Sequence, residues 1–417
     1  MKTIVHQQQF LALRAAHDRS PEITLARGRV GLYARPPQGA LRLDPQEFLG
    51  KVQALQEEIN AQLIDMQESV AVCLAALLAG ENVFLISLPG AAKSTLARLV
   101  AEAINGQFFR VVLNPDISRN DLIGSLDPQA IQQGRWQRKL SGIATASVAL
   151  LDEFFKSSGV VRNMLLDALE EHRVAQPDGD SHIPLLLGIA ASNEIVDASA
   201  KNAVWDRMLF RLKVNYPHAD EDWLQLLGSD SGRRGIATRL DPEEIMLFQA
   251  LVELRARELA RPIQQAMNKV RKEWVRKGGV VSPRRFLGWA RAIVAAALLE
   301  GSDAIQPRHL MVGQYILWTD LEDIPAVVQI VGGISDPERA LLLSVAADIE
   351  QLENQADSLE NLQALAKFRA QLTKLGAKLE RGIHSSQHAE RRGALLAAIA
   401  KLQDEGVEKA IALAAAK

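Results

Sequence analysis

Small residues lie between an apolar segment and a stretch that is typical of a helix start. The apolar segment is 83–87, the small residues are Pro89-Gly90-Ala91-Ala92, and Lys93-Ser94-Thr95 would open the helix. Backbone N–H groups of such a loop, and of the helix N-terminus after it, favour a bound phosphate. Lys93 could then contact the β- and γ-phosphates of a nucleotide, and the hydroxyl of Ser94 could bind Mg²⁺.

Two acidic residues follow another apolar segment, at 148–151. Asp152 and Glu153 would emerge at the carboxyl end of a parallel strand, where ligands bind in open α/β sheets. Asp152 could hold Mg²⁺ and Glu153 could polarise the attacking water. Such a pair can also serve only as a helix N-cap. Ser87 and Ala92 stand where the pattern G-x-x-x-x-G-K-[ST] has glycines, so an ordinary strand–turn–helix junction is the alternative for the loop.

Polar residues farther along the chain could complete a nucleotide site. Asn193 ends an apolar segment and could orient a water beside the γ-phosphate, or simply begin a loop. Arg207 and Arg211 are four residues apart, so a helix would place them on one face, and such a pair usually marks a solvent-exposed face. Arg284 follows Ser282-Pro283, a predicted N-cap and first helical position. An arginine there opposes the helix dipole, which suggests an anion nearby; a solvent-exposed surface is the alternative.

Four short apolar segments predict the strands of a parallel sheet, because they alternate with helical patterns and lack a polar face. They are 83–87, 109–113, 148–151 and 185–191. Asp44-Pro45 predicts a helix start, and the helical pattern that follows breaks near Asn60. Apolar spacings of three and four within 336–417 predict a helical hairpin or coiled coil with its turn at 382–388.

These patterns predict four parts: an N-terminal extension (1–47), an α/β nucleotide-binding domain (48–214), an all-α lid (215–331) and a C-terminal helical arm (332–417). The length of 417 residues is enough for several domains. Hydrophobic residues are 48% and charged residues 24%, as in ordinary globular proteins. The net charge of −2 predicts no general attraction to nucleic acid.

The sequence also argues against several environments. The single cysteine, Cys73, lies in an apolar helical run, so we expect a small core residue and not a reactive thiol or an internal disulfide. No apolar segment approaches the roughly 18 residues that span a bilayer. The N-terminus lacks the apolar core of a signal peptide. We therefore expect a cytoplasmic protein without a membrane span.

In order and spacing, these residues resemble the MoxR branch of the AAA+ ATPases, and most of all its RavA-like members, over roughly 50–330. The resemblance rests on Pro89-Gly90-x-Ala92-Lys93-Ser94, Asp152-Glu153, Leu165-Leu166-Asp167-Ala168-Leu169-Glu170-Glu171-His172, Ala190-Ala191-Ser192-Asn193-Glu194 and Asp206-Arg207-Met208-Leu209-x-Arg211-Leu212. Alanine before the lysine is typical of RavA-like members. Ser87 departs from the pattern, and so does His172, where arginine is usual.

The resemblance implies an AAA+ P-loop core, a parallel sheet with helices on both faces, that binds ATP and Mg²⁺. Residues 89–95 would hold the phosphates, Ser94 and Asp152 the metal, and Glu153 would activate the water. Asn193 would be the first sensor and Arg284 the second. An arginine finger, Arg207 or Arg211, would act from the neighbouring subunit of a homo-oligomeric ring, commonly a hexamer.

The function implied by the resemblance is ATP-driven remodelling or maturation of a protein partner, often one with a VWA domain. One alternative is a chelatase-type motor for metal insertion. Another is a nucleotide-gated scaffold with little hydrolysis, in which Ser87 and Ala92 mark a decayed loop. A GTPase is also conceivable, because these residues do not distinguish adenine from guanine. RavA-like proteins usually carry partly β domains after the lid, whereas heptad-like helix stands here, which leaves the partner open.

Overall fold

A computed structural model of the chain describes residues 23–26, 29–32, 41–177, 179–193, 203–217, 219–228, 235–302, 304–356, 362–384 and 389–415. Contacts group the chain into two units. Unit 1 comprises Met1–Arg261 and Gly279–Leu321, and unit 2 comprises Pro262–Gly278 and Glu322–Lys417. Each unit is described by itself. The domain boundaries predicted from the sequence stay predictions.

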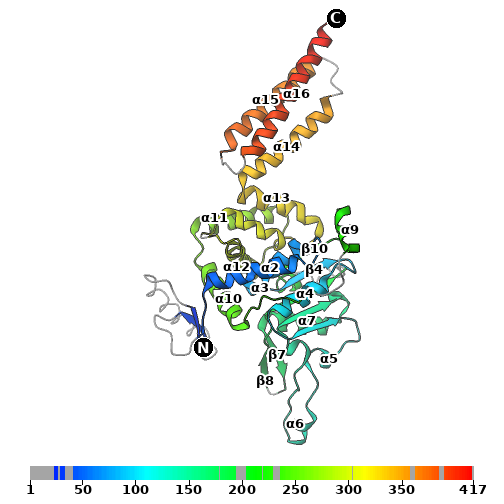
Figure 1. Cartoon of the computed structure of the whole chain (residues 1–417), viewed down its shortest axis with the longest axis vertical. Helices are drawn as coiled ribbons and strands as arrows, with labels where there is room; N and C mark the ends of the chain where they lie inside the picture. Colours follow the sequence, from blue (N-terminus) through cyan, green and yellow to red (C-terminus); the bar gives the residue numbers. More distant parts are fainter. Residues whose placement is uncertain are drawn as a thin grey trace. The chain divides into compact units, whose positions relative to one another are not determined.

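The central sheet of unit 1 is parallel, with the strand order β10-β4-β9-β6-β5. Figure 1 labels two neighbouring strands of this sheet, β10 and β4. Its strands are β4 (Val83–Ser87), β5 (Phe108–Val112), β6 (Val148–Asp152), β9 (Leu187–Ser192) and β10 (Phe210–Val214). The first four confirm the predicted strands. Every residue of β4 and β9 is buried, as expected for strands covered on both faces.

Strand β10 corrects the prediction that Arg207 and Arg211 share a helix face. Residues 210–214 pair in parallel register with 83–87, so Arg211 belongs to a strand, whereas Arg207 lies in the turn before it. The spacing of Arg207 and Arg211 in the sequence is compatible with a helix and with a turn followed by a strand. Only pairing with β4, a contact between residues distant in sequence, selects the strand.

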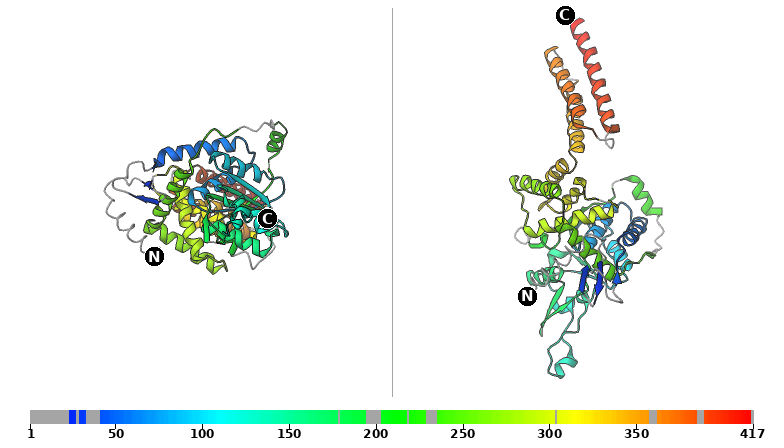
Figure 2. Two further views of the ribbon diagram at one scale, coloured as in Figure 1. Left: turned by 90° about the horizontal axis from the view of Figure 1, so that it is seen from below. Right: turned by 90° about the vertical axis from the view of Figure 1, so that its left-hand side faces the viewer.

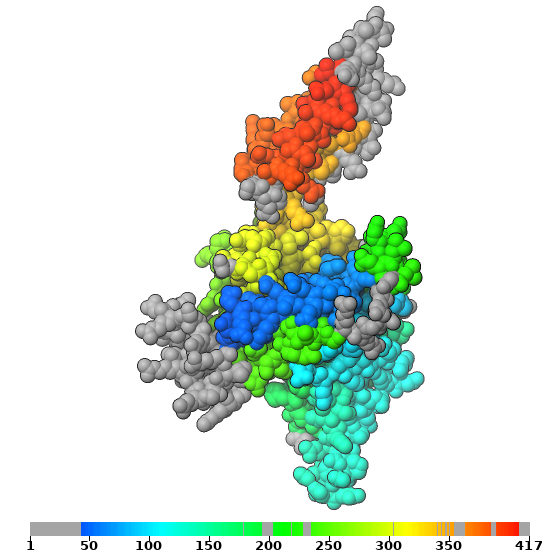
Figure 3. All heavy atoms as spheres, in the orientation of Figure 1, coloured from blue at the N-terminus to red at the C-terminus, as the bar shows by residue number. Residues whose placement is uncertain are grey.

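Two helices illustrate how local sequence shapes unit 1. Helix α2 (Pro45–Asn60) begins as predicted: the Asp44 carboxylate accepts hydrogen bonds from the backbone N–H groups of Gln46 and Glu47. It lies along the surface shown in Figure 3 and ends at the predicted break. Helix α3 (Gln67–Ala79) contacts β10 and β4. Its Cys73 is buried, and burial raises the pKa of the thiol to about 12, which confirms a core residue.

Unit 1 continues through α4 (Lys93–Ala103), which packs against β5 and β6, and two short helices, α5 (Arg119–Ile123) and α6 (Pro128–Gln132). Helix α7 (Gly159–Glu171) leads into a hairpin of β7 (Arg173–Gln176) and β8 (Gly179–His182). A small antiparallel sheet, β2 (Arg29–Leu32), β1 (Ile23–Ala26) and β3 (Leu41–Arg42), lies within the predicted N-terminal extension.

The remaining helices of unit 1 are α9 (Asp220–Gly228), α10 (Pro242–Arg257), α12 (Pro283–Leu299) and the 3-10 segment Pro307–Tyr315. Helix α12 packs against α3, α10 and that segment. It begins as predicted, with Pro283 in its first turn and Ser282 as N-cap; the Ser282 hydroxyl accepts from the Arg285 N–H at 3.1 Å. Arg291 of α12 binds the carboxylates of Glu81 and Glu253.

Unit 2 is helical. Most of α11 (Arg261–Arg276) belongs to it, with α13 (Ile324–Ser335), α14 (Pro337–Ala356), α15 (Leu362–Gly382) and α16 (Ala389–Ala415). Helices α14, α15 and α16 pack on one another, so α14 adds a third helix to the predicted hairpin (Figure 2). Their shared core contains the predicted apolar positions Ile349, Leu352, Phe368, Leu372, Leu379, Ile399 and Leu402. The predicted position Leu359 and most of the predicted turn lie outside the described residues.

Among the residues that the structure describes, no helix is both long and apolar enough to cross a membrane.

Candidate nucleotide site

The predicted phosphate loop and the predicted acidic pair meet at the carboxyl edge of the sheet. Lys93, the first residue of α4, is only 8% exposed. Its Nζ lies 3.3 Å from Oδ1 of Asp152, the last residue of β6. Strand β9 lies between β4 and β6, and Asn193 follows its last residue at the same edge. The tertiary fold therefore brings Lys93, Asp152 and Asn193 to one edge.

The loop conformation explains one of the two departures from the glycine pattern. Ala92 has φ 52° and ψ 13°, in the left-handed region where glycine is favoured. An alanine there costs about 1–2 kcal/mol, and such strain concentrates at ligand-binding loops. Ser87 is not among the described residues with a positive φ, because it ends a strand in ordinary extended pairing with Val214. The backbone therefore does not require glycine at position 87.

Replacing Ala92 by glycine should raise the free energy of unfolding by up to about 1 kcal/mol, because relief of the left-handed strain exceeds the entropic cost of glycine. Urea unfolding of the full chain measures this difference. Ala91, its neighbour, is not among the positive-φ residues, so Ala91→Gly is the matched control and should destabilise. A larger loss of stability in Ala92→Gly than in Ala91→Gly would contradict the strain at Ala92.

Two polar atoms beside the loop are buried without a hydrogen-bond partner in the described part of the chain: Oγ of Ser87 and Oε2 of Glu153. Glu153 also has a positive φ of 55°, and its Oε2 lies 3.3 Å from the Lys156 ammonium. Buried polar groups are normally satisfied. A polar ligand at this edge of the sheet would satisfy the Ser87 hydroxyl, whereas Oε2 of Glu153 already has the Lys156 ammonium as its ionic partner.

The oxygen donors of this edge fit a nucleotide-bound Mg²⁺. Asp152 supplies a carboxylate, and Ser94, the second residue of α4, supplies a hydroxyl. No group of three or more His, Cys, Asp or Glu side chains suited to a metal occurs among the described residues. In Mg²⁺ sites of nucleotide-binding proteins, one or two protein oxygens act together with water and phosphate oxygens.

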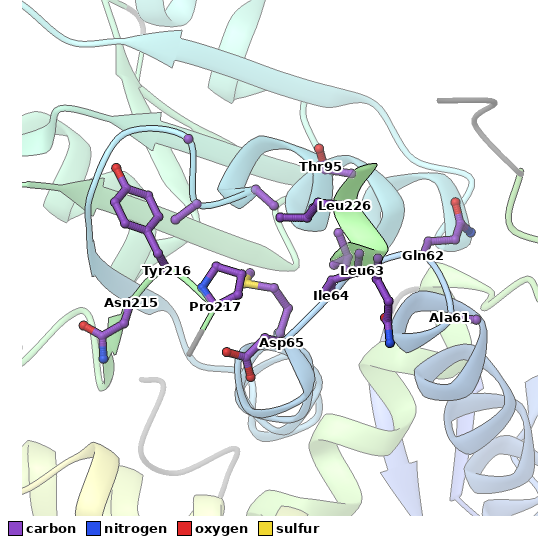
Figure 4. A pocket seen from close by; sticks show the side chains of 15 residues that line it. Ala61, Gln62, Leu63, Ile64, Asp65, Thr95, Asn215, Tyr216, Pro217 and Leu226 are labelled. Carbon is purple, nitrogen blue, oxygen red and sulfur yellow. The ribbon is translucent and has the colours of Figure 1, made fainter. Parts of the chain in front are cut away.

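A cavity of about 610 Å³ adjoins the phosphate loop. Its volume suits a small-molecule site. Figure 4 shows the side chains that surround it; they come from the connection between α2 and α3, the start of α4, the segment after β10, and α9. The Tyr216 hydroxyl donates to the Pro89 carbonyl at 2.7 Å and so ties this wall to the phosphate loop. The loop residues 90–92 and Thr95 in this lining were predicted, whereas the other lining residues were not; the helix break near Asn60 was the available signal for them.

Arg207 and Arg284 lie together, away from the phosphate loop of their own chain. Nε of Arg207 binds Glu170 Oε2 at 2.8 Å, and Nη2 of Arg284 binds Oε1 of the same carboxylate. The Arg207 carbonyl accepts from the Asn82 side chain, at the amino end of β4. The phosphate loop leaves the other end of this five-residue strand, about 13 Å away at 3.3 Å per residue. The structure thus separates both arginines from Lys93.

Arg211, the other candidate finger, is fully buried. Its guanidinium lies 5.3 Å from the ring centroid of Trp205 and 5.0 Å from that of Trp318. It donates to the backbone carbonyls of Trp205, Leu209, Ile316 and Trp318. Burial, and secondly the charge of Arg285, lowers the pKa of this guanidinium. These contacts hold β10 to residues 316–318 and keep Arg211 from solvent.

The structure also explains His172, where the resemblance led us to expect arginine. His172 ends α7 in the left-handed conformation, with φ 49°, and its Nδ1 lies 2.9 Å from the Leu185 carbonyl oxygen. Histidine is among the residues enriched at positive φ. Burial lowers the pKa of the imidazole below its ordinary value, so the ring is neutral at pH 7. His172 therefore contributes a helix end and not a cation.

Comparisons with known proteins agree with this geometry. Residues 50–242 match the family model described as the MoxR domain in the MoxR-vWA-beta-propeller ternary systems. The uncharacterized protein MJ0079 of Methanocaldococcus jannaschii is 27% identical over 74% of this chain and 81% of its own length. The uncharacterized YeaC of Bacillus subtilis is 28% identical over 64% of this chain and 84% of its own.

Solved structures share the fold. A crystal structure of a suspected ATPase from Cytophaga hutchinsonii aligns with a TM-score of 0.56 and 17% identity, over 70% of this chain and 94% of that one. The α/β core with helical additions, predicted from the sequence, is thereby confirmed. The matched MoxR domain contains the phosphate loop, the acidic pair and Asn193. Residues 50–242 of this chain therefore form a MoxR-type AAA+ domain.

Proposed function

We propose that this chain binds ATP together with Mg²⁺ and hydrolyses it. The observation that carries the proposal is the approach of Lys93 to Asp152 at the carboxyl edge of the sheet. Lys93 and the N-terminus of α4 would neutralise the phosphates, while Ser94 and Asp152 would hold the metal that bridges them. Glu153 would act as the base for the attacking water, and Asn193 would orient that water.

The proposal includes a ring of identical subunits. Arg207 and Arg284 lie at the amino edge of the sheet, whereas Lys93 lies at the carboxyl edge. An arginine that stabilises the transition state must contact the γ-phosphate. Both arginines would therefore serve the nucleotide of an adjacent subunit, and hydrolysis would depend on assembly. The burial of Arg211 supports Arg207 as the finger. A hexamer is the ring size that the family resemblance suggests.

We further propose that the ring remodels or matures a protein with a VWA domain. The matched family model describes MoxR domains of ternary systems that contain a vWA component, and this description supports the proposal. The RavA-like affiliation remains a prediction, as does a cytoplasmic location. This step is tested by capturing partner proteins with full-length Glu153→Gln protein in the presence of ATP and comparing them with those captured by Lys93→Ala protein. The proposal would be contradicted if Glu153→Gln protein retained no more VWA-domain protein than Lys93→Ala protein.

Replacing Lys93 by alanine should weaken ATP binding by roughly tenfold to hundredfold, because a charge-assisted hydrogen bond contributes about 1.5–3 kcal/mol. Titration calorimetry with ATP and Mg²⁺ measures the affinity. Lys213 of β10 is exposed in the same sheet, so Lys213→Ala is the matched control and should bind as the unaltered chain does. Equal affinity in all three proteins would place the nucleotide elsewhere. Tight binding without phosphate release would instead favour the scaffold alternative.

A further inference from the structure

The carboxylate of Glu170 joins three elements of unit 1. Glu170 lies near the end of α7, Arg207 in the turn before β10, and Arg284 in the first turn of α12. Both arginines bind this one carboxylate, each at a different oxygen. Since α7, β10 and α12 are distant in sequence, only the tertiary fold creates this contact.

A second carboxylate fixes the same junction. Oδ1 of Asp206 accepts from the Ser282 hydroxyl at 2.9 Å and from Nη2 of the buried Arg285 at 3.2 Å. The residue before Arg207 is thereby bound to the residues that flank Arg284. The backbones that carry the two arginines are thus linked to each other, and both guanidinium groups contact Glu170.

We propose that Glu170 is a positioning residue, which holds Arg207 and Arg284 as one cationic pair ready to meet the γ-phosphate of a nucleotide bound by a second copy of this chain. This inference rests on the proposed function. Two adjacent guanidinium groups repel each other, and their side chains lose conformational entropy when they are fixed. A carboxylate between them offsets the repulsion and orders both side chains before the nucleotide arrives. An arginine set in place before the reaction stabilises a transition state better than one that must first be ordered.

Arg284 remains accessible to a phosphate, whereas the Arg207 side chain is 25% exposed and its Nη1 donates to the Ala203 carbonyl at 3.3 Å. The Arg284 side chain is 47% exposed although Nη2 is held by Glu170. A guanidinium has five N–H donors, so one that binds a carboxylate through a single nitrogen retains others for phosphate oxygens. Glu170 itself is 19% exposed. It touches the arginines and not the reacting atoms, which is why it is a positioning residue.

The test uses full-length subunits mixed in pairs. Acceptor subunits carry Arg207→Ala but keep Lys93 and Glu153; donor subunits carry Glu153→Gln but keep both arginines. Neither alone should release phosphate rapidly, whereas a mixture should, because donors supply arginines to acceptors. Adding Glu170→Gln to the donor should lower the recovered rate about tenfold to hundredfold, the loss expected from a misplaced catalytic group. Adding it to the acceptor should change nothing, since the acceptor's own arginine pair is already broken.

Asp167 provides the matched control. It lies on the same helix, its Oδ1 is 3.9 Å from Arg207 Nη2, and it is 70% exposed. Asp167→Asn in the donor should leave the recovered rate unchanged, and all variants should unfold at the same temperature. If donors with and without Glu170→Gln restored the same rate of phosphate release, the role of Glu170 would be contradicted while the proposed function would stand. The same holds if Glu170→Gln lowered the rate equally when placed in the acceptor. No recovery with the unmodified donor would overturn the proposed trans arrangement and the inference with it.

Discussion

Replacement of Arg207 by alanine is expected to lower the rate of ATP hydrolysis by about 10³-fold or more, as loss of an arginine finger does in related phosphoryl transfers. ATP affinity should change little, because Arg207 lies at the opposite edge of the sheet from the Lys93 loop. Steady-state phosphate release and titration calorimetry measure the two quantities. A proportional loss of affinity and rate would contradict a role in trans.

Arg211→Ala distinguishes this effect from simple damage to the fold. Arg211 is stacked between Trp205 and Trp318 and satisfies buried carbonyls. Its truncation should cost stability, on the order of 3 kcal/mol, by leaving a cavity and unsatisfied acceptors. Arg207→Ala should unfold as the unaltered chain does, since its partners remain partly exposed. If Arg207→Ala lost as much stability as Arg211→Ala, its low rate would no longer indicate a finger.

Glu153→Gln is expected to lower turnover by about 10²–10⁴-fold while ATP binding persists, because the amide keeps the shape of the side chain but cannot accept the proton. Glu153 directly follows Asp152, and its backbone N–H donates to Asp152 Oδ1 at 3.1 Å. The substitution leaves that backbone contact intact. Single-turnover measurements with excess enzyme separate the chemical step from binding.

Glu57→Gln is the control for loss of a carboxylate, since Glu57 is exposed on α2 and is not among the residues that line the cavity. It should hydrolyse ATP at the unaltered rate. Full turnover by Glu153→Gln would remove Glu153 as the base. Loss of binding along with turnover would indicate that Glu153 holds the nucleotide and does not activate water.

Much of the fold could be predicted because the controlling signals are local. Asp44 and Ser282 cap their helices through side chains a few residues from the N–H groups they accept. Strands β4, β6 and β9 are apolar runs bounded by turn-forming residues. Strand β10 was missed because its alternation is short and its pairing partner lies more than a hundred residues earlier. Sequence spacing alone could not decide between a strand and a helix at Arg211.

The sequence by itself determined which residues could do the chemistry: the Lys93 loop, the acidic pair Asp152-Glu153, Asn193 and the arginines. Their types and order depend only on phosphate and metal chemistry. The tertiary structure alone decided their distribution. It places Arg207 and Arg284 on Glu170 at the edge opposite Lys93 and buries Arg211 between two tryptophans. Strand order and parallel register decide at which edge of the sheet a side chain lies. Both arise from contacts between residues that are far apart in the chain.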